Sequence, residues 1–370
     1  MQTMHLTLPV GAFDWQENPL SEIDFQERVG TLRAIMATKG WGGVLVFGEI
    51  HECGLLTYYS NYAARLSPAL TLIPLEGDLR VLTLVGGRMV PAGKLTTWIE
   101  DVRPAGNLAE SLGEWLAENA SGGEMAIAGF DLMKAGDYAS IADIAEIATA
   151  EDATDVLWQL IRTKSSQEVT MMKDNCAILD EVVTVVTKSQ ENNDSPASSA
   201  IVAEKIARNL GAQDARCLYS PNGGKTFLPF QKLSGDRSDP FILYVALKMR
   251  GYWADGFITI GIQNEAIKSA LDEMIVVAKP GASFSDLAAA QNKHINGAQS
   301  HPVLLGSLGS GIGVSLEEVP ILTPGSPDTI KTGDIISLKL GIIEDNGQAG
   351  FASALVHVQS SGNEILWKST

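Results

Sequence analysis

Residues 334–343, with the sequence DIISLKLGII, constrain the fold of this chain more than any other segment. Turn sequences precede the run at Pro324-Gly325 and Thr332-Gly333, and the apolar residues that follow predict a buried β-strand. Lys339 stands in the middle of that strand. It must either meet a carboxylate or extend its amine to solvent at a sheet edge, because an unpaired buried charge is strongly destabilising. Both alternatives remain open at this point.

The composition and net charge of the chain indicate a globular protein that does not bind polyanions. It has 370 residues, enough for two domains, with 45% hydrophobic and 19% charged residues. The formal net charge of −17 argues against nucleic-acid or anionic-membrane partners. No apolar run is long enough to span a bilayer, and the first residues lack the pattern of a signal peptide. Cys53, Cys176 and Cys217 are widely spaced, so we expect reduced thiols and a cytoplasmic location.

Alternating helix and strand patterns predict an α/β protein of two domains. Residues 25–39 place apolar side chains on one helical face, and Gly40 follows as a stop. Strand and helix patterns then alternate to about residue 160. In the stretch LIRTKSSQE, Ser165 or Ser166 can cap a long helix. We therefore expect one domain in residues 1–160 and a second in residues 161–370.

Four stretches, in order and nearly without gaps between residues 160 and 358, together resemble one known family. They are LIRTKSSQEVTMMKDNCAILD, GYWADGFITIG, GSLGSGIGVSLEEVPILTPGS and GDIISLKLGII. The chain resembles the creatinase, prolidase and aminopeptidase P family, metallopeptidase family M24. The resemblance implies a small three-layer N-terminal domain and a C-terminal α+β domain with the pita-bread fold, in a homodimer. The N-terminal domain fits more weakly, through its helix and strand pattern and the segment YYSNY at residues 58–62.

The resemblance also locates the positions where metallopeptidases of the family hold two divalent cations with two Asp, one His and two Glu. These positions fall on Tyr244, Asp255, Ser310, Lys339 and about Ser353. Hard divalent cations need several oxygen or imidazole donors that converge on one point. One carboxylate, two hydroxyls, a phenol and an ammonium do not provide them. We therefore predict no metal and no other cofactor, with the ammonium of Lys339 neutralising Asp255.

Further candidates lie where the family has auxiliary histidines or substrate contacts. Those histidine positions fall on Gly306, on Glu317 and near Phe230. Glu317 is a candidate acid or base that faces the site, or else a solvated loop carboxylate. Arg65 follows the tyrosine segment, where relatives reach a neighbouring subunit, and it can clamp a substrate carboxylate or be an ordinary surface arginine. Tyr62 and Phe230 complete this predicted substrate-binding set.

Three functions are compatible with the sequence. The favoured one is metal-independent hydrolysis, or a related lyase step, on a small amide-, amidine- or amino-acid-like C–N substrate, since creatinase in this family works without metal. A desolvated lysine can act as a general base or stabilise an oxyanion. The alternatives are a non-catalytic relative that binds a ligand or a protein, and an Xaa-Pro metallopeptidase. The candidate catalytic residues are Tyr244, Asp255, Ser310, Glu317, Lys339 and Ser353.

Overall fold

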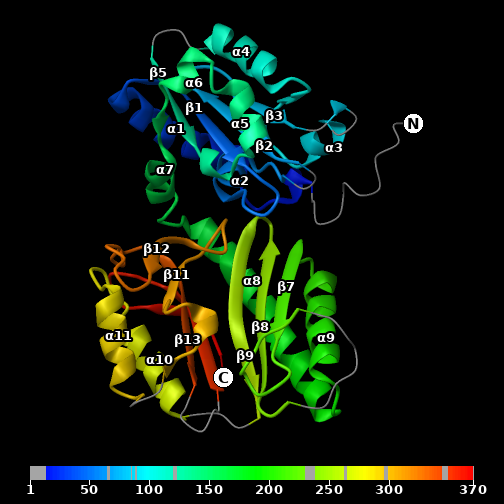
Figure 1. The fold of residues 1–370 in the computed structure, drawn as a ribbon, viewed down its shortest axis with the longest axis vertical. Coiled ribbons are helices and arrows are strands. Elements are labelled where there is room, and N and C mark those ends of the chain that lie inside the picture. Colours follow the sequence, from blue (N-terminus) through cyan, green and yellow to red (C-terminus); the bar gives the residue numbers. More distant parts are fainter. Residues whose placement is uncertain are drawn as a thin grey trace. The chain divides into compact units, whose positions relative to one another are not determined.

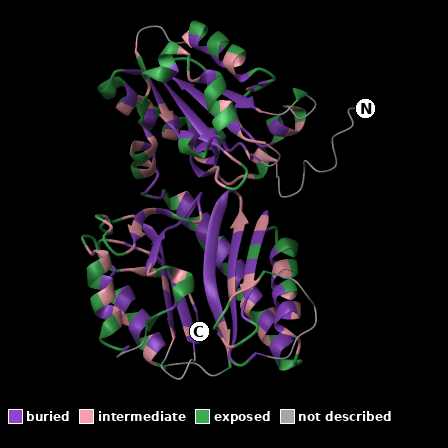
Figure 2. Ribbon diagram, in the orientation of Figure 1, coloured by how far each residue is buried: buried purple, intermediate pink, exposed green. Residues whose placement is uncertain are grey.

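The computed structural model describes residues 14–64, 67–84, 86–87, 90–119, 123–229, 238–261, 265–295, 299–343 and 349–369. The chain divides into two compact units, Met1–Ile161 and Arg162–Thr370. Within the described ranges, no helix is both long and apolar enough to cross a membrane. In each unit the strands are mostly buried, and the exposed residues gather on the outward faces of the helices (Figure 2).

The N-terminal unit is built around one six-stranded mixed sheet (Figure 1). Its elements are α1 (Glu22–Lys39), β1 (Trp41–Gly48), α2 (Gly54–Ser60), β2 (Ala69–Pro74), β3 (Arg80–Thr83), α3 (Val90–Leu95), β4 (Asp101–Pro104), α4 (Leu108–Asn119), β5 (Glu124–Ala128), α5 (Ala135–Ile141), α6 (Ala145–Ala148), β6 (Glu151–Asp152) and α7 (Thr154–Leu160). The strand order is β4-β3-β2-β1-β5-β6. Strands β1, β2 and β3 pair antiparallel, whereas the β3–β4, β1–β5 and β5–β6 pairs are parallel.

Helices cover both faces of this sheet, which gives three layers. Leu45 and Phe47 of β1 pack in one cluster with apolar residues of α4, α5 and α6. Helix α1 also contacts β1 but contributes no residue to that cluster. The helix begins three residues before the predicted start, because Ser21 and Asp24 form a capping box. It ends as predicted at Gly40, whose φ of 77° is left-handed.

The C-terminal unit has two antiparallel sheets, each backed by helices (Figure 1). Its elements are α8 (Ser166–Glu191), α9 (Pro196–Asn209), β7 (Asp214–Tyr219), β8 (Phe241–Met249), β9 (Tyr252–Ile260), α10 (Glu265–Val277), α11 (Phe284–Asn292), β10 (Gln299–Ser300), β11 (Gly309–Gly311), β12 (Glu318–Leu322), β13 (Ile335–Ile343), β14 (Ala349–His357) and β15 (Glu364–Lys368). One sheet has the order β7-β8-β9, and the other has the order β12-β11-β13-β14-β15 with β10 added beside β13.

The two sheets meet through β9, which contacts both β13 and β14. Helices α8 and α9 lie beside the first sheet, and α10 and α11 lie beside the second (Figure 1). Alternate residues of β13, such as Ile336, Leu338 and Leu340, are buried in a core with α10 and α11. Because side chains alternate along a strand, Ser337 and Lys339 must point to the opposite face, toward β9. This alternation places the polar residues of β13 between the two sheets.

Candidate functional site

A polar cluster around Asp255 lies between the two sheets of the C-terminal unit. Asp255 is on β9 and is fully buried. Its Oδ2 lies 2.7 Å from the Lys339 Nζ and accepts a hydrogen bond of 2.7 Å from the Tyr244 hydroxyl. Its Oδ1 accepts a 2.7 Å bond from the hydroxyl of Ser337. The ion pair expected between Lys339 and Asp255 is therefore present, and the lysine side chain is only 17% exposed.

Strand register explains why residues distant in sequence converge here. On the β8–β9 ladder, Tyr244 is opposite Phe257 and Asp255 is opposite Ala246. Phe257 and Asp255 are two residues apart, so both pairs direct their side chains to one face. That face meets β13, whose Ser337 and Lys339 are also two residues apart. The period of two in both sheets thus gathers one carboxylate and three donors.

The charges around Tyr244 keep its hydroxyl protonated. Burial raises the pKa of Tyr244 well above its ordinary value, and the charge of Asp255 with the hydrogen bond to it adds to the rise. The carboxylate of Glu317 raises the pKa slightly further. The Lys339 Nζ lies 5.7 Å from the centre of the Tyr244 ring, within the range of a cation–π contact. Tyr244 is therefore a neutral donor rather than a base.

Ser310 and Ser353 flank the cluster on the neighbouring strands. Ser310 on β11 is the register partner of Ser337 and is 4% exposed. Ser353 on β14 is the partner of Lys339. The Ser353 hydroxyl accepts a 2.7 Å bond from the Phe257 backbone amide, which ties β14 to β9. Both predicted serines thus adjoin the ion pair, and Ser353 has a clear structural contact as well.

Glu317 is close to the cluster but is exposed, whereas the next residue, Glu318, is buried. The carboxylate charge of Glu317 contributes to the raised pKa of Tyr244 as the last of several causes, after that of Asp255. Adjacent residues at the start of a strand point to opposite sides, so only one of the two glutamates enters the interior. The sequence offered no sign that it would be Glu318.

Of the predicted substrate-binding residues, Arg65 and Phe230 lie outside the described residues. Tyr62 is 6% exposed within the N-terminal unit, where a side chain at Gly93 would meet its ring carbon at 3.0 Å. The role of Tyr62 in substrate binding stays a prediction.

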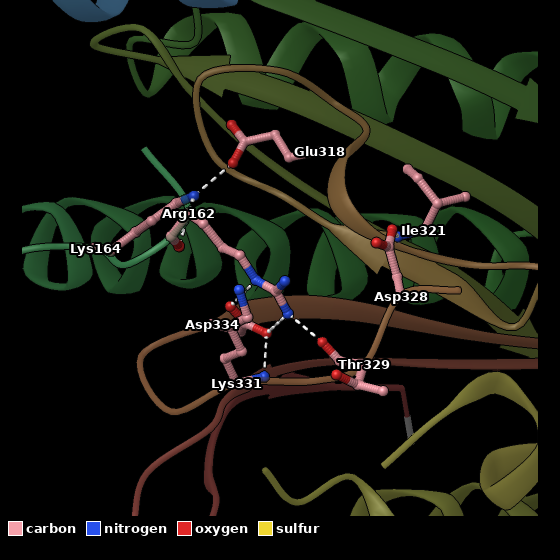
Figure 3. Close-up of polar contacts among 8 residues, drawn as sticks. All are labelled: Arg162, Lys164, Glu318, Ile321, Asp328, Thr329, Lys331 and Asp334. Atoms are coloured by element: carbon pink, nitrogen blue, oxygen red, sulfur yellow. Dashed lines mark hydrogen bonds and ion pairs between the residues drawn. The ribbon is translucent and has the colours of Figure 1, made fainter. Parts of the chain in front are cut away.

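Two buried ion pairs that the sequence did not reveal lie in the same C-terminal unit (Figure 3). Arg162 binds Asp334 through two bonds, Nε to Oδ1 at 2.7 Å and Nη2 to Oδ2 at 2.6 Å. Lys164 binds the Oε2 of Glu318, whose Oε1 accepts a 3.0 Å bond from the Ser315 amide. We call these four charged residues, Arg162, Lys164, Glu318 and Asp334, the buried ion-pair cluster. The only indication of these pairs in the sequence was the positive charge of the segment LIRTK.

Gly313 gives the Lys164–Glu318 pair its room. A side chain at Gly313 would meet the Lys164 Cε at 2.7 Å and the Glu318 Oε1 at 2.8 Å. At Gly313 the absence of a side chain permits the close approach of an ion pair. Gly313 is therefore required by space, since its φ is not left-handed.

We expect Gly313→Ala to lower the free energy of unfolding by about 1–3 kcal/mol, the usual range for overpacking a filled interior. Urea unfolding followed by circular dichroism measures this. Gly30→Ala is the control, because Gly30 is exposed on α1 with nothing within 4 Å of the added carbon; it should gain up to about 1 kcal/mol from helix propensity. An unchanged free energy of unfolding in the Gly313 variant would show that the ion pair can move aside at little cost.

Two antiparallel sheets, each backed by a pair of helices and preceded by a small three-layer α/β unit, define the pita-bread class of proteins. The chain belongs to metallopeptidase family M24, whose family model matches residues 171–359. No curated protein matches the chain.

Solved structures share this fold at low sequence identity. The prolidase from Pyrococcus horikoshii OT3 has a TM-score of 0.77 and 17% identity, covering 93% of this chain and 99% of that one. The X-Pro aminopeptidase from Thermotoga maritima MSB8 has a TM-score of 0.75 and 16% identity, covering 92% and 97%. The Xaa-Pro dipeptidase from Bacillus anthracis has a TM-score of 0.70 and 18% identity, covering 94% and 98%. At these identities the likeness establishes the fold alone.

The donors in the polar cluster do not fit the two divalent cations that the family implies. Both oxygens of Asp255 already accept hydrogen bonds, and the Lys339 ammonium lies 2.7 Å from one of them. A fixed cation at that distance repels another cation and competes for the same oxygen. Across the described ranges, no group of three or more His, Cys, Asp or Glu side chains is placed to hold a metal ion.

Proposed function

We propose that the C-terminal unit binds a small amide-, amidine- or amino-acid-like molecule and hydrolyses a C–N bond in it without metal. One observation carries the proposal: the Lys339 Nζ lies 2.7 Å from the Asp255 Oδ2, where the family resemblance places metal ligands. The ammonium of Lys339 supplies a positive charge at the position that divalent cations take in metallopeptidases. In an enzyme of this kind, the positive charge that activates the substrate comes from a lysine side chain instead of a metal ion.

Lys339 is the residue that polarises the substrate. An ammonium has three donors, and Asp255 accepts from one of them. The remaining donors can bind a carbonyl oxygen and stabilise the oxyanion that forms on it, because a partly buried charge acts strongly there. Asp255, held by Tyr244 and Ser337, orients the ammonium. Asp255 itself is a positioning group in this scheme.

Glu317 is the proposed base. It is exposed, and its charge contributes to the raised pKa of Tyr244, so the proposal gives it access to both solvent and substrate. Glu317 takes a proton from water as the water oxygen attacks the carbonyl carbon, and the carbonyl electrons move to the oxygen beside Lys339. When the oxyanion collapses, the C–N bond breaks and the departing nitrogen takes the proton from Glu317. Ser310 and Ser353 line the polar side of the site.

A second candidate function, ligand binding without catalysis, has one observation in its favour. Three donors already bond to the two oxygens of the fully buried Asp255 carboxylate, which leaves about one of its four acceptor positions for a substrate proton. In that case Lys339 still anchors the carboxylate or carbonyl group of a ligand. The two functions share the anchor and differ in whether Glu317 acts as a base.

Turnover of a panel of small amides, amidines and dipeptides, with and without EDTA, tests the proposal. We expect activity that survives the chelator and falls by at least about 10²-fold in Lys339→Met, the loss typical of removing one oxyanion donor. Glu317→Gln should lose turnover and keep binding. Lys293→Met is the control, because that lysine is 60% exposed on the surface. Activity that needs added metal contradicts the proposal, and binding lost in Lys339→Met with no turnover favours the second function.

The same proposal treats the protein as a cytoplasmic homodimer with neither nucleic-acid nor membrane partners. It is supported by the net charge of −17 and by Cys53, Cys176 and Cys217, which are free cysteines. Burial raises the pKa of the Cys176 and Cys217 thiols, to about 12 for Cys217, so these two are unreactive. Sedimentation at several concentrations measures the state of association.

A further inference from the structure

A short segment at the start of the C-terminal unit contacts β9, β12 and the residues that precede β13. Arg162 binds Asp334, the residue before β13, and also donates to the Thr329 carbonyl (Figure 3). Lys164 binds Glu318 at the start of β12. Glu168, on the first turn of α8, accepts a 2.7 Å bond from the hydroxyl of Tyr252 at the start of β9. These contacts hold β13, the glycine-rich loop and β9 to one segment.

The Lys164–Glu318 pair is the contact best isolated from solvent. The side chains of Lys164 and Glu318 are 3% and 0% exposed. Besides Glu318, the Lys164 Nζ donates to the Arg162 carbonyl at 3.3 Å. Glu318 accepts from the Ser315 amide at 3.0 Å. A buried ion pair whose two groups also make further hydrogen bonds restricts the conformations of the loop that contains it.

The loop that this pair restrains lies within residues 309–318, between β11 and β12 of one sheet, and it also contacts β9 of the other sheet. The Gly313 carbonyl accepts a 2.7 Å bond from the Trp253 amide, two residues before Asp255. On the other side, Ser310 pairs with Ser337 in the β11–β13 ladder. The backbone amide of Lys339 donates to the Leu308 carbonyl at 3.0 Å. The strand β13 that carries Lys339 is thus bonded to the start of this loop, and the strand β9 that carries Asp255 is bonded to it at Gly313.

We propose that Lys164 and Glu318 are positioning residues that set the distance between Lys339 and Asp255 through this loop. The inference rests on the proposed function, because it concerns the same site, yet neither residue touches the reacting atoms. Their buried charges are an unfavourable way to fill an interior, and the loop they restrain is the one that spans the polar cluster. An apolar pair of similar volume fills the space and leaves the loop free to shift.

The test compares wild type with the double variant Lys164→Met/Glu318→Met. Removing both charges leaves no unpaired ion, so the variant is expected to fold. Hydrogen exchange at the Trp253 amide and in residues 309–318 should rise by about tenfold or more. The side-chain NMR signal of Lys339 should shift. Lys293→Met/Glu273→Met, an exposed pair joined at 2.6 Å in the same unit, is the matched control and should change neither.

These readouts need no substrate, so they separate this inference from the proposed function. Absence of turnover in wild type would contradict the proposed function and leave exchange and the Lys339 signal interpretable. Unchanged exchange and an unchanged Lys339 signal in the folded double variant would overturn the positioning role. Should the double variant fail to fold, Gly313→Ala displaces the pair with both charges kept, and it must show the same exchange pattern at smaller size. Where turnover exists, kcat should fall with KM nearly unchanged.

Discussion

Replacing Lys339 with methionine is expected to lower the free energy of unfolding by about 3 kcal/mol at neutral pH. Removing one partner of a buried ion pair costs about 3–5 kcal/mol, and the lower end applies because the Lys339 side chain is 17% exposed. Asp255 then stays fully buried with only the hydroxyls of Tyr244 and Ser337 to stabilise its charge. Urea unfolding at 25 °C measures the loss.

The control is the double variant Lys339→Met/Asp255→Asn, which removes both charges. The asparagine carbonyl oxygen can accept from one of the two hydroxyls, so the double variant should be much more stable than Lys339→Met alone. The coupling between the two sites, obtained from the double-mutant cycle, should be at least about 1 kcal/mol. Additive effects would show that the two charges do not depend on each other, in conflict with their 2.7 Å separation.

Restoring the family ligands is expected to create metal binding that wild type lacks. The variant carries Tyr244→Asp, Ser310→His, Lys339→Glu and Ser353→Glu, with Asp255 retained. Four carboxylates and an imidazole then converge where a fixed ammonium stood, and such donors bind Mn²⁺ or Co²⁺. At a free cation concentration of 100 times the dissociation constant, one bound cation stabilises the fold by about 2.7 kcal/mol. Elemental analysis and thermal unfolding with added metal report both effects.

Wild type and the single variant Lys339→Glu frame this experiment. Wild type should show no stoichiometric metal and no metal-dependent shift in melting temperature. Lys339→Glu alone places two acidic groups together, so it should lose stability that added cations partly restore. Stoichiometric Mn²⁺, Zn²⁺ or Co²⁺ in wild type beside Asp255 would overturn the interpretation of Lys339 as a built-in cation.

Much of the architecture followed from local patterns in the sequence. The apolar alternation around Lys339 identified β13, and the expected cap of the long helix is Ser165, whose hydroxyl accepts from the Glu168 amide. Gly40 ended α1 as expected. These features depend on neighbours a few residues apart, and local hydrogen bonding and steric preferences decide them.

The candidate site was only partly predictable. Lys339, Asp255 and Tyr244 were identified as one group through the family resemblance, and Ser337, which completes the shell of Asp255, was not. Glu317 was named as a candidate acid or base because it falls on a histidine position of the family. Sequence spacing does not reveal which of two adjacent glutamates turns inward. The buried partner of Glu318 is Lys164, 154 residues away, and no local pattern connects residues so far apart.

The order of amino acids by itself determined the helices, the strands and the presence of a lysine where the family has a metal ligand. Only the tertiary structure decided which hydroxyls complete the shell of Asp255 and which charged residues hold the loop nearby. The physical reason is that secondary structure depends on short-range preferences, whereas the balance of a buried charge depends on every group brought within a few ångströms of it. For Lys339, those groups come from β8, β9 and β13.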